Sequence, residues 1–191
     1  VVAATSEPGR VVTNGMSQYS RNERNANAAL VVGIDPARDY PGHPLAGIEL
    51  QRQLESRAYD MGGGDYLAPA QLVGDFLRNV ASTALGSVEP SYKPGVRLCN
   101  LNELLPAFAA QAIREAIPEF NKQIAGFAMD DAILTGAETR TSSPVSIKRD
   151  PITLQSINTP GLYPAGEGAG YAGGILSAAV DGIKIAEAVA K

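Results

Sequence analysis

The glycine-rich stretch near the C-terminus constrains the fold of this chain more than any other part of the sequence. Residues 161–174 read GLYPAGEGAGYAGG and contain one carboxylate, Glu167. Residues 161–165 favour a short strand, and from Ile175 to Val189 apolar residues recur at helical spacing. We therefore predict a strand, a glycine loop and a helix, a unit whose backbone N–H groups can cradle an anion or a cofactor.

This segment does not read as the opening fingerprint of a dinucleotide-binding domain. Such a βαβ unit continues to a second strand, with an acidic residue about 20 positions after its glycines. The sequence ends at Lys191 before such a strand, and it begins with strand-like residues and no initiator Met. We expect a fragment of a larger protein that carries the closing part of a Rossmann-like domain. A mature protein after signal cleavage is the alternative.

Composition limits the functions that this chain can have. The net charge is −4 with no basic cluster, so neither nucleic acid nor an anionic membrane is an expected partner. No apolar run approaches the roughly 18–20 residues needed to span a bilayer. A single cysteine, Cys99, and a single histidine, His43, provide neither a disulfide nor a structural zinc site. We expect no metal and a reducing, cytoplasmic location.

Strand and helix patterns alternate without strict βαβ order, which favours an α+β insert beside a completing α/β segment. We expect strands belonging to the Rossmann-like domain over 1–14, the α+β insert or substrate domain over 15–150, and the cofactor-binding segment over 151–191. Within these regions the pattern predicts a hairpin of 1–5 with 11–13, a central strand at 28–34, helices at 45–59 and 69–80, a helix opening at Asn100, and strands at 133–140 and 145–148.

Several motifs, taken in order, resemble one family of flavoproteins. They are VTNGMS at 12–17, NANAA at 25–29, HPLAGI at 43–48, GGDYLAPAQ at 63–71, GAETRTSSPV at 136–145 and the glycine stretch at 161–174. Together they resemble the C-terminal half of uncharacterised FAD-dependent dehydrogenases, bacterial-type NAD(P)/FAD-dependent oxidoreductases with a glutathione-reductase-like FAD domain. The N-terminal fingerprint that holds the FAD pyrophosphate in that family has no counterpart here.

The resemblance assigns cofactor roles within the glycine stretch. Glu167 would accept a hydrogen bond from a ribityl hydroxyl, and Gly166 opens the loop. The backbone N–H groups of Gly173, Gly174 and Ile175 would face the N1/O2 edge of the isoalloxazine, where the helix dipole favours negative charge. The alternative is a plain glycine-rich helix entry with a solvated Glu167.

Arg140 is the candidate substrate residue, since an arginine fork can clamp a substrate carboxylate. An ion pair with Glu138, Asp130 or Asp131 is its alternative. Three further features keep two interpretations each. A polar cluster is either functional or a solvated loop, and it comprises Arg21, Arg24, Asn25 and Asn27. The segment 62–66 is either a lid with Tyr66 or a helix stop, and His43 is either an acid/base group or a loop residue. Cys99 lacks the partner cysteine that disulfide-reductase chemistry needs.

The resemblance therefore implies an FAD-dependent oxidoreductase as the full-length protein, with a small-molecule substrate and NAD(P)H as a candidate electron donor. This part alone is expected to be inactive and to retain no FAD, and a homodimer is one way to cover its exposed edges. A non-catalytic module that binds a small anion or a partner is the alternative function.

Overall fold

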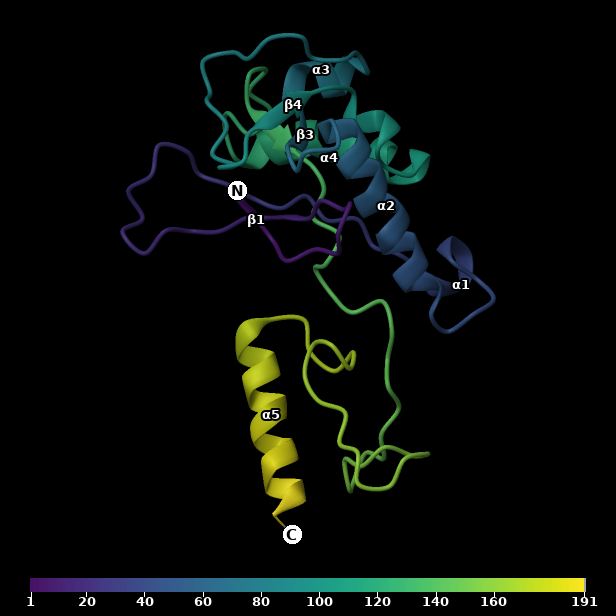
Figure 1. Cartoon of the computed structure of the whole chain (residues 1–191). Helices are drawn as coiled ribbons and strands as arrows, with labels where there is room; N and C mark the ends of the chain where they lie inside the picture. Colours follow the sequence, from purple (N-terminus) through teal and green to yellow (C-terminus); the bar gives the residue numbers. More distant parts are fainter. Residues whose placement is uncertain (191) are drawn as a thin grey trace. The chain divides into compact units, whose positions relative to one another are not determined.

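The computed structural model describes residues 1–190, which form two compact units (Figure 1). The first unit comprises 1–34 and 51–139, and the second comprises 35–50 and 140–190 within the described residues. The three-part division expected from the sequence concerns the domains of a parent protein, so it stays a prediction.

The first unit begins with the predicted hairpin. β1 (Val2–Ala3) pairs antiparallel with β2 (Thr13–Asn14), which confirms the pairing of the two N-terminal segments. Val11 is buried, and its N–H donates to the Glu55 carbonyl of α2 (Ala46–Gly62) at 3.1 Å. The helix predicted at 45–59 is thus confirmed, and it anchors the hairpin.

A three-stranded sheet forms the centre of this unit. β3 (Ala68–Leu72) lies between β4 (Val96–Leu98), to which it runs parallel, and β5 (Ile133–Thr135), to which it runs antiparallel. Ala70 is paired on both sides, with Leu98 and with Thr135. β5 confirms the first part of the strand predicted at 133–140.

The helix predicted at 69–80 is wrong over its first residues. Pro69, Ala70 and Gln71 lie in β3, and α3 (Val73–Arg78) begins only afterwards. Alanine and glutamine favour a helix locally, but two neighbouring strands pair with this segment and bury it completely. Tertiary pairing therefore overrides local propensity here.

The helix predicted from Asn100 is interrupted by a proline. Asn100 caps a short 3₁₀ helix (Leu101–Glu103), and its side chain accepts from the Asn102 N–H at 3.2 Å. α4 (Ala107–Gln123) starts after Pro106, because the residue before a proline is disfavoured in helical conformation. The core of the unit packs between these helices and the sheet, and its largest buried apolar side chains are Phe76, Leu104 and Ile117.

The predicted central strand at 28–34 is also wrong. These residues belong to no strand in the described part of the chain, and Val31 is 63% exposed. A strand needs a neighbour for its backbone N–H and C=O groups, and none of the described strands pairs with this run. Its apolar character is therefore not used in a sheet here.

The second unit contains α1 (Pro36–Asp39), the first residues of α2, a long irregular segment and α5 (Ile175–Val189). Figure 1 shows α5 in yellow beside this irregular segment. The helix predicted after Gly174 is confirmed. The strands predicted at 145–148 and 161–165 are wrong, because neither segment forms a strand in the described part of the chain.

No helix within residues 1–190 is long and apolar enough to cross a membrane.

Candidate functional site

The glycine-rich loop of the second unit closes on itself over six residues. The Tyr171 N–H donates to the Gly166 carbonyl at 3.0 Å, and the Gly170 N–H donates to the Glu167 carbonyl at 2.9 Å. Gly166 and Gly170 have φ angles of +68° and +81°, a region that side-chain-bearing residues rarely adopt. The glycines are thus required by the turn, and the loop is a defined structure.

The segment that precedes this loop in sequence holds it in place. The Ile147 N–H donates to the Ala169 carbonyl at 3.1 Å, and the Ser143 hydroxyl lies 3.1 Å from the Gly168 carbonyl. A Cβ on Gly170 would lie 2.6 Å from the Val145 carbonyl oxygen, so only glycine fits against this segment. The GAETRTSSPV motif and the glycine stretch are therefore joined in space.

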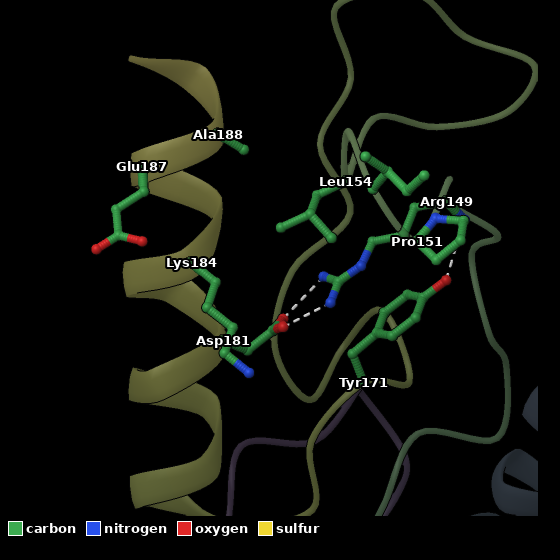
Figure 2. A pocket seen from close by; sticks show the side chains of 9 residues that line it. Arg149, Pro151, Leu154, Tyr171, Asp181, Lys184, Glu187 and Ala188 are labelled. Carbon is green, nitrogen blue, oxygen red and sulfur yellow. Dashed lines mark hydrogen bonds and ion pairs between the residues drawn. The ribbon is translucent and has the colours of Figure 1, made fainter. Parts of the chain in front are cut away.

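A buried ion pair connects the loop to α5 (Figure 2). Asp181 accepts from Arg149 Nη2 at 2.6 Å and from Arg149 Nη1 at 2.9 Å, and the Gly166 N–H donates to Asp181 Oδ2 at 2.8 Å. The Arg149 and Asp181 side chains are only 9% and 10% exposed. The Arg149 guanidinium, helped by the Gly166 N–H, lowers the pKa of Asp181 from 3.8 to about 2.

Two further groups surround the Arg149 guanidinium. It donates to the Pro164 carbonyl at 2.7 Å and lies 3.7 Å from the centroid of the Tyr171 ring. The Tyr171 hydroxyl also accepts a hydrogen bond from the backbone N–H of Arg149 at 3.0 Å. The Asp181 carboxylate hydrogen bond is the main cause that raises the pKa of Arg149. The pair is consequently charged at neutral pH and well hydrogen-bonded.

A groove of about 510 Å³ lies over this ion pair, between α5 and the irregular segment. Its remaining walls are apolar or solvated, with Ile152 and Leu154 on one side and Lys184 and Glu187 on the helix. Arg149 and Asp181 neutralise each other, so the remaining charged side chains of the lining are Lys184 and Glu187 on the helix.

The residues predicted to face a flavin lie at the open side of the loop. Glu167 and Gly173 are exposed, and Ile175 is 90% exposed. Gly174 is the N-cap of α5 and gives its first turn no side-chain hydrogen bond. A Cβ on Gly173 would meet nothing within 4 Å, so space is open there. The structure thus leaves these residues accessible; their roles stay predictions.

Arg140 is exposed and lies in the second unit. Two of its alternative ion-pair partners are engaged elsewhere in the first unit: Asp130 is 3.5 Å from Arg78, and Asp131 accepts from the Ser87 N–H at 3.0 Å. Glu138 accepts from the Gly15 N–H at 3.4 Å. Neither the substrate clamp nor the ion pair is tested by these contacts.

The other sequence candidates have structural contacts. Gly63 and Gly64 end α2 with positive φ, and the Tyr66 hydroxyl accepts from the Gly9 N–H at 3.2 Å. His43 Nδ1 accepts from the Leu45 N–H at 3.1 Å. For 62–66 the contacts suit a helix stop, and for His43 they suit a loop residue. A lid at 62–66 and an acid/base role of His43 stay predictions.

The polar cluster of the first unit is partly engaged with another loop. Arg24 forms an ion pair with the Glu89 carboxylate, and the Asn25 side chain donates to the Glu89 carbonyl at 2.8 Å. Burial raises the pKa of the Cys99 thiol, which makes it a poor nucleophile at neutral pH. A functional role for the polar cluster stays a prediction. Among residues 1–190, no group of three or more His, Cys, Asp or Glu could hold a metal ion.

Sequence reasoning missed Arg149 and Asp181. They are separated by 32 residues, and no local motif links them. One signal could have identified Asp181: it is a carboxylate on the helix face formed by Ala178, Ile185 and Ala188, where a charge is retained only with a partner.

Two comparisons with known proteins bear on this chain. A family model described as "FAD-dependent protein, C-terminal domain-like" matches residues 1–141. An uncharacterized protein of Clostridium beijerinckii is 57% identical over 188 residues, which cover 98% of this chain and 35% of that protein. The chain therefore spans about a third of the length of this relative. The alignment with the relative, unlike the family match, extends over the glycine loop and α5.

Proposed function

Because the chain belongs to the family of FAD-dependent proteins, as their C-terminal domain-like part, we propose that its parent is an FAD-dependent oxidoreductase of the dehydrogenase type. In this proposal the chain supplies the substrate domain and the loop that faces the ribityl chain and the isoalloxazine, on a glutathione-reductase-like FAD domain. The bound flavin would accept and release the reducing equivalents. The residues described here bind and orient it.

The observation that carries the proposal is the accessible glycine loop before α5. Gly174 gives the first turn no side-chain cap, and open space surrounds Gly173, so a planar polar group can approach the backbone N–H groups there. The helix dipole contributes about half a positive charge at this end, which suits an N1/O2 edge that becomes negative on reduction. The residues therefore fit a flavin.

Glu167 has a separate role in this proposal. It is the single carboxylate of the loop, and it is exposed and so able to accept a hydrogen bond from a ribityl hydroxyl. Arg140 is proposed as a clamp for an acidic substrate, and NAD(P)H as the electron donor. These two assignments, like a cytoplasmic location, rest on the sequence resemblance.

The exposed face of α5 supports a parent protein with further parts. Leu176, Val180 and Ile183 are 82%, 51% and 61% exposed, although they lie at helical spacing on one face. The opposite face packs against the irregular segment of the same unit, and it carries Asp181 and one large apolar residue, Ile185. A contiguous exposed apolar surface of this kind is typical of a site where another protein part packs. We propose that the FAD-binding part of the parent covers it, since the chain matches only 35% of its relative.

The test uses the full-length parent protein and its visible absorption spectrum. We expect bound FAD at a stoichiometry near one, and a Glu167→Ala variant that loses it on dialysis faster than a Glu119→Ala control on α4. A full-length protein that is colourless and cannot be reconstituted with FAD would overturn the proposal. Retention of a small anion alone would favour the non-catalytic binding module.

A second arm tests the surface of α5. This chain alone should dimerise or aggregate through the exposed face, and Ile183→Ser should reduce this self-association in analytical ultracentrifugation. The same substitution in the full-length parent should destabilise it. A wild-type stability there would show that no other part of the parent covers this face.

A further inference from the structure

The Arg149–Asp181 pair contacts both ends of the glycine loop. At the entrance, Arg149 Nη1 donates to the Pro164 carbonyl at 2.7 Å while Asp181 accepts from the Gly166 N–H at 2.8 Å. At the exit, the Tyr171 ring lies 3.7 Å from the guanidinium carbon. The pair therefore fixes the backbone on either side of Ala165 and the last residue of the turn.

The cost of burying this pair argues for a specific use. A charge on a buried helix face is expensive unless every lone pair is satisfied, and replacement by apolar residues is often neutral or stabilising. Here Asp181 receives three hydrogen bonds, one of them from the loop backbone itself. The hydrogen bond from the Gly166 N–H ties this ion pair directly to the backbone of the glycine loop.

Glu167 directly follows Gly166, whose N–H donates to the Asp181 carboxylate. Its own side chain is exposed, and the hydrogen bond from the Gly170 N–H to its carbonyl is made within the turn. The direction of its carboxylate thus depends on a turn whose entrance and exit are both set by the ion pair. Without the ion pair, the turn would keep its internal hydrogen bonds, but it could change its orientation relative to α5.

We propose that Arg149 and Asp181 are positioning residues that hold the glycine loop so that Glu167 points at the flavin ribityl chain. This inference rests on the proposed function, because it requires Glu167 to bind FAD. It goes beyond that function by assigning the alignment of the loop to two residues that do not touch the cofactor.

The decisive experiment is a double-mutant cycle in the full-length parent, read as the FAD dissociation constant. Asp181→Asn removes the charge while keeping the shape, and it is measured in the Glu167 and the Glu167→Ala backgrounds. We expect Asp181→Asn to weaken FAD binding about tenfold with Glu167 present, and less than about twofold without it, because coupled residues are not additive. Arg149→Lys should behave in the same way, since lysine loses the two-pronged contact and the stacking.

Asp150→Asn is the matched control. Asp150 is adjacent to Arg149 and caps a turn by accepting from the Ile152 and Thr153 N–H groups at 2.9 and 2.7 Å, but it does not hold the loop. It should lower the melting temperature without changing FAD affinity. If Asp181→Asn fails to fold, Arg149→Lys and Tyr171→Phe, which lose less, carry the cycle. The visible circular dichroism of bound flavin, which reports its surroundings, should change with Asp181→Asn and not with Asp150→Asn.

Two outcomes have different meanings. Equal loss of FAD affinity in both Glu167 backgrounds, or none in either, would overturn the positioning role and leave the ion pair as a structural contact. Wild-type FAD affinity in the Glu167→Ala single variant would instead overturn the proposed role of Glu167, and the inference with it.

Discussion

Acid titration of Asp181 offers the sharpest physical test of the second unit. Its pKa is lowered from 3.8 to about 2, chiefly by the Arg149 guanidinium. A carboxyl group with a lowered pKa in the folded state stabilises that state fully above its unfolded pKa. This stabilisation is lost as the pH falls through about 4 towards 2, because the unfolded state then binds the proton more readily.

The magnitude follows from the size of the shift. At about 1.4 kcal/mol per pKa unit, the shift of Asp181 corresponds to about 2 kcal/mol at pH 7. Arg149 stays charged throughout, so the whole pH dependence of the pair belongs to the carboxylate. Asp75, Asp131 and Asp150 also have lowered pKa values, so the total acid response of the protein will be larger.

The assay therefore compares the wild type with Asp181→Asn, which lacks the titrating group. We expect the difference in unfolding free energy, measured by urea denaturation, to shrink by about 2 kcal/mol between about pH 6 and pH 2. The carbon NMR shift of the Asp181 carboxyl group should titrate with a midpoint near the lowered value. A midpoint at the ordinary aspartate pKa, or a stability difference independent of pH, would refute the buried ion pair.

Three further predictions address the loop and its neighbours. Glu167→Ala should cost about 1.5–3 kcal/mol of FAD affinity in the full-length parent, measured by fluorescence titration, while Glu119→Ala should cost nothing. Arg140→Lys should raise the apparent KM for an acidic substrate more than it lowers the melting temperature, and the reverse result would favour a structural ion pair. Gly170→Ala should destabilise the second unit by about 1–3 kcal/mol in urea denaturation, because its φ is +81° and a backbone carbonyl would lie 2.6 Å from the new Cβ, whereas Gly173→Ala should leave stability unchanged.

Local chemistry was enough to predict several elements from the sequence. The strand-like segments 1–5 and 11–13 predicted the N-terminal hairpin, and helical spacing predicted α2 and α5. In each of these elements the deciding interactions lie within a few residues of each other. The same holds for the glycine loop, where turn geometry requires positive φ at Gly166 and Gly170.

Tertiary structure decided the elements that depend on distant partners. Residues 68–72 became a strand because β4 and β5 pair with them, against their helical propensity. Residues 28–34 and 161–165 have apolar sequences suited to strands but pair with no strand in the described chain. The Arg149–Asp181 pair, which holds the candidate cofactor loop, joins residues 32 positions apart and leaves no local pattern. The sequence by itself determined the chemistry of the loop, whereas long-range contacts decided how that loop is held, because such contacts depend on which segments meet in space.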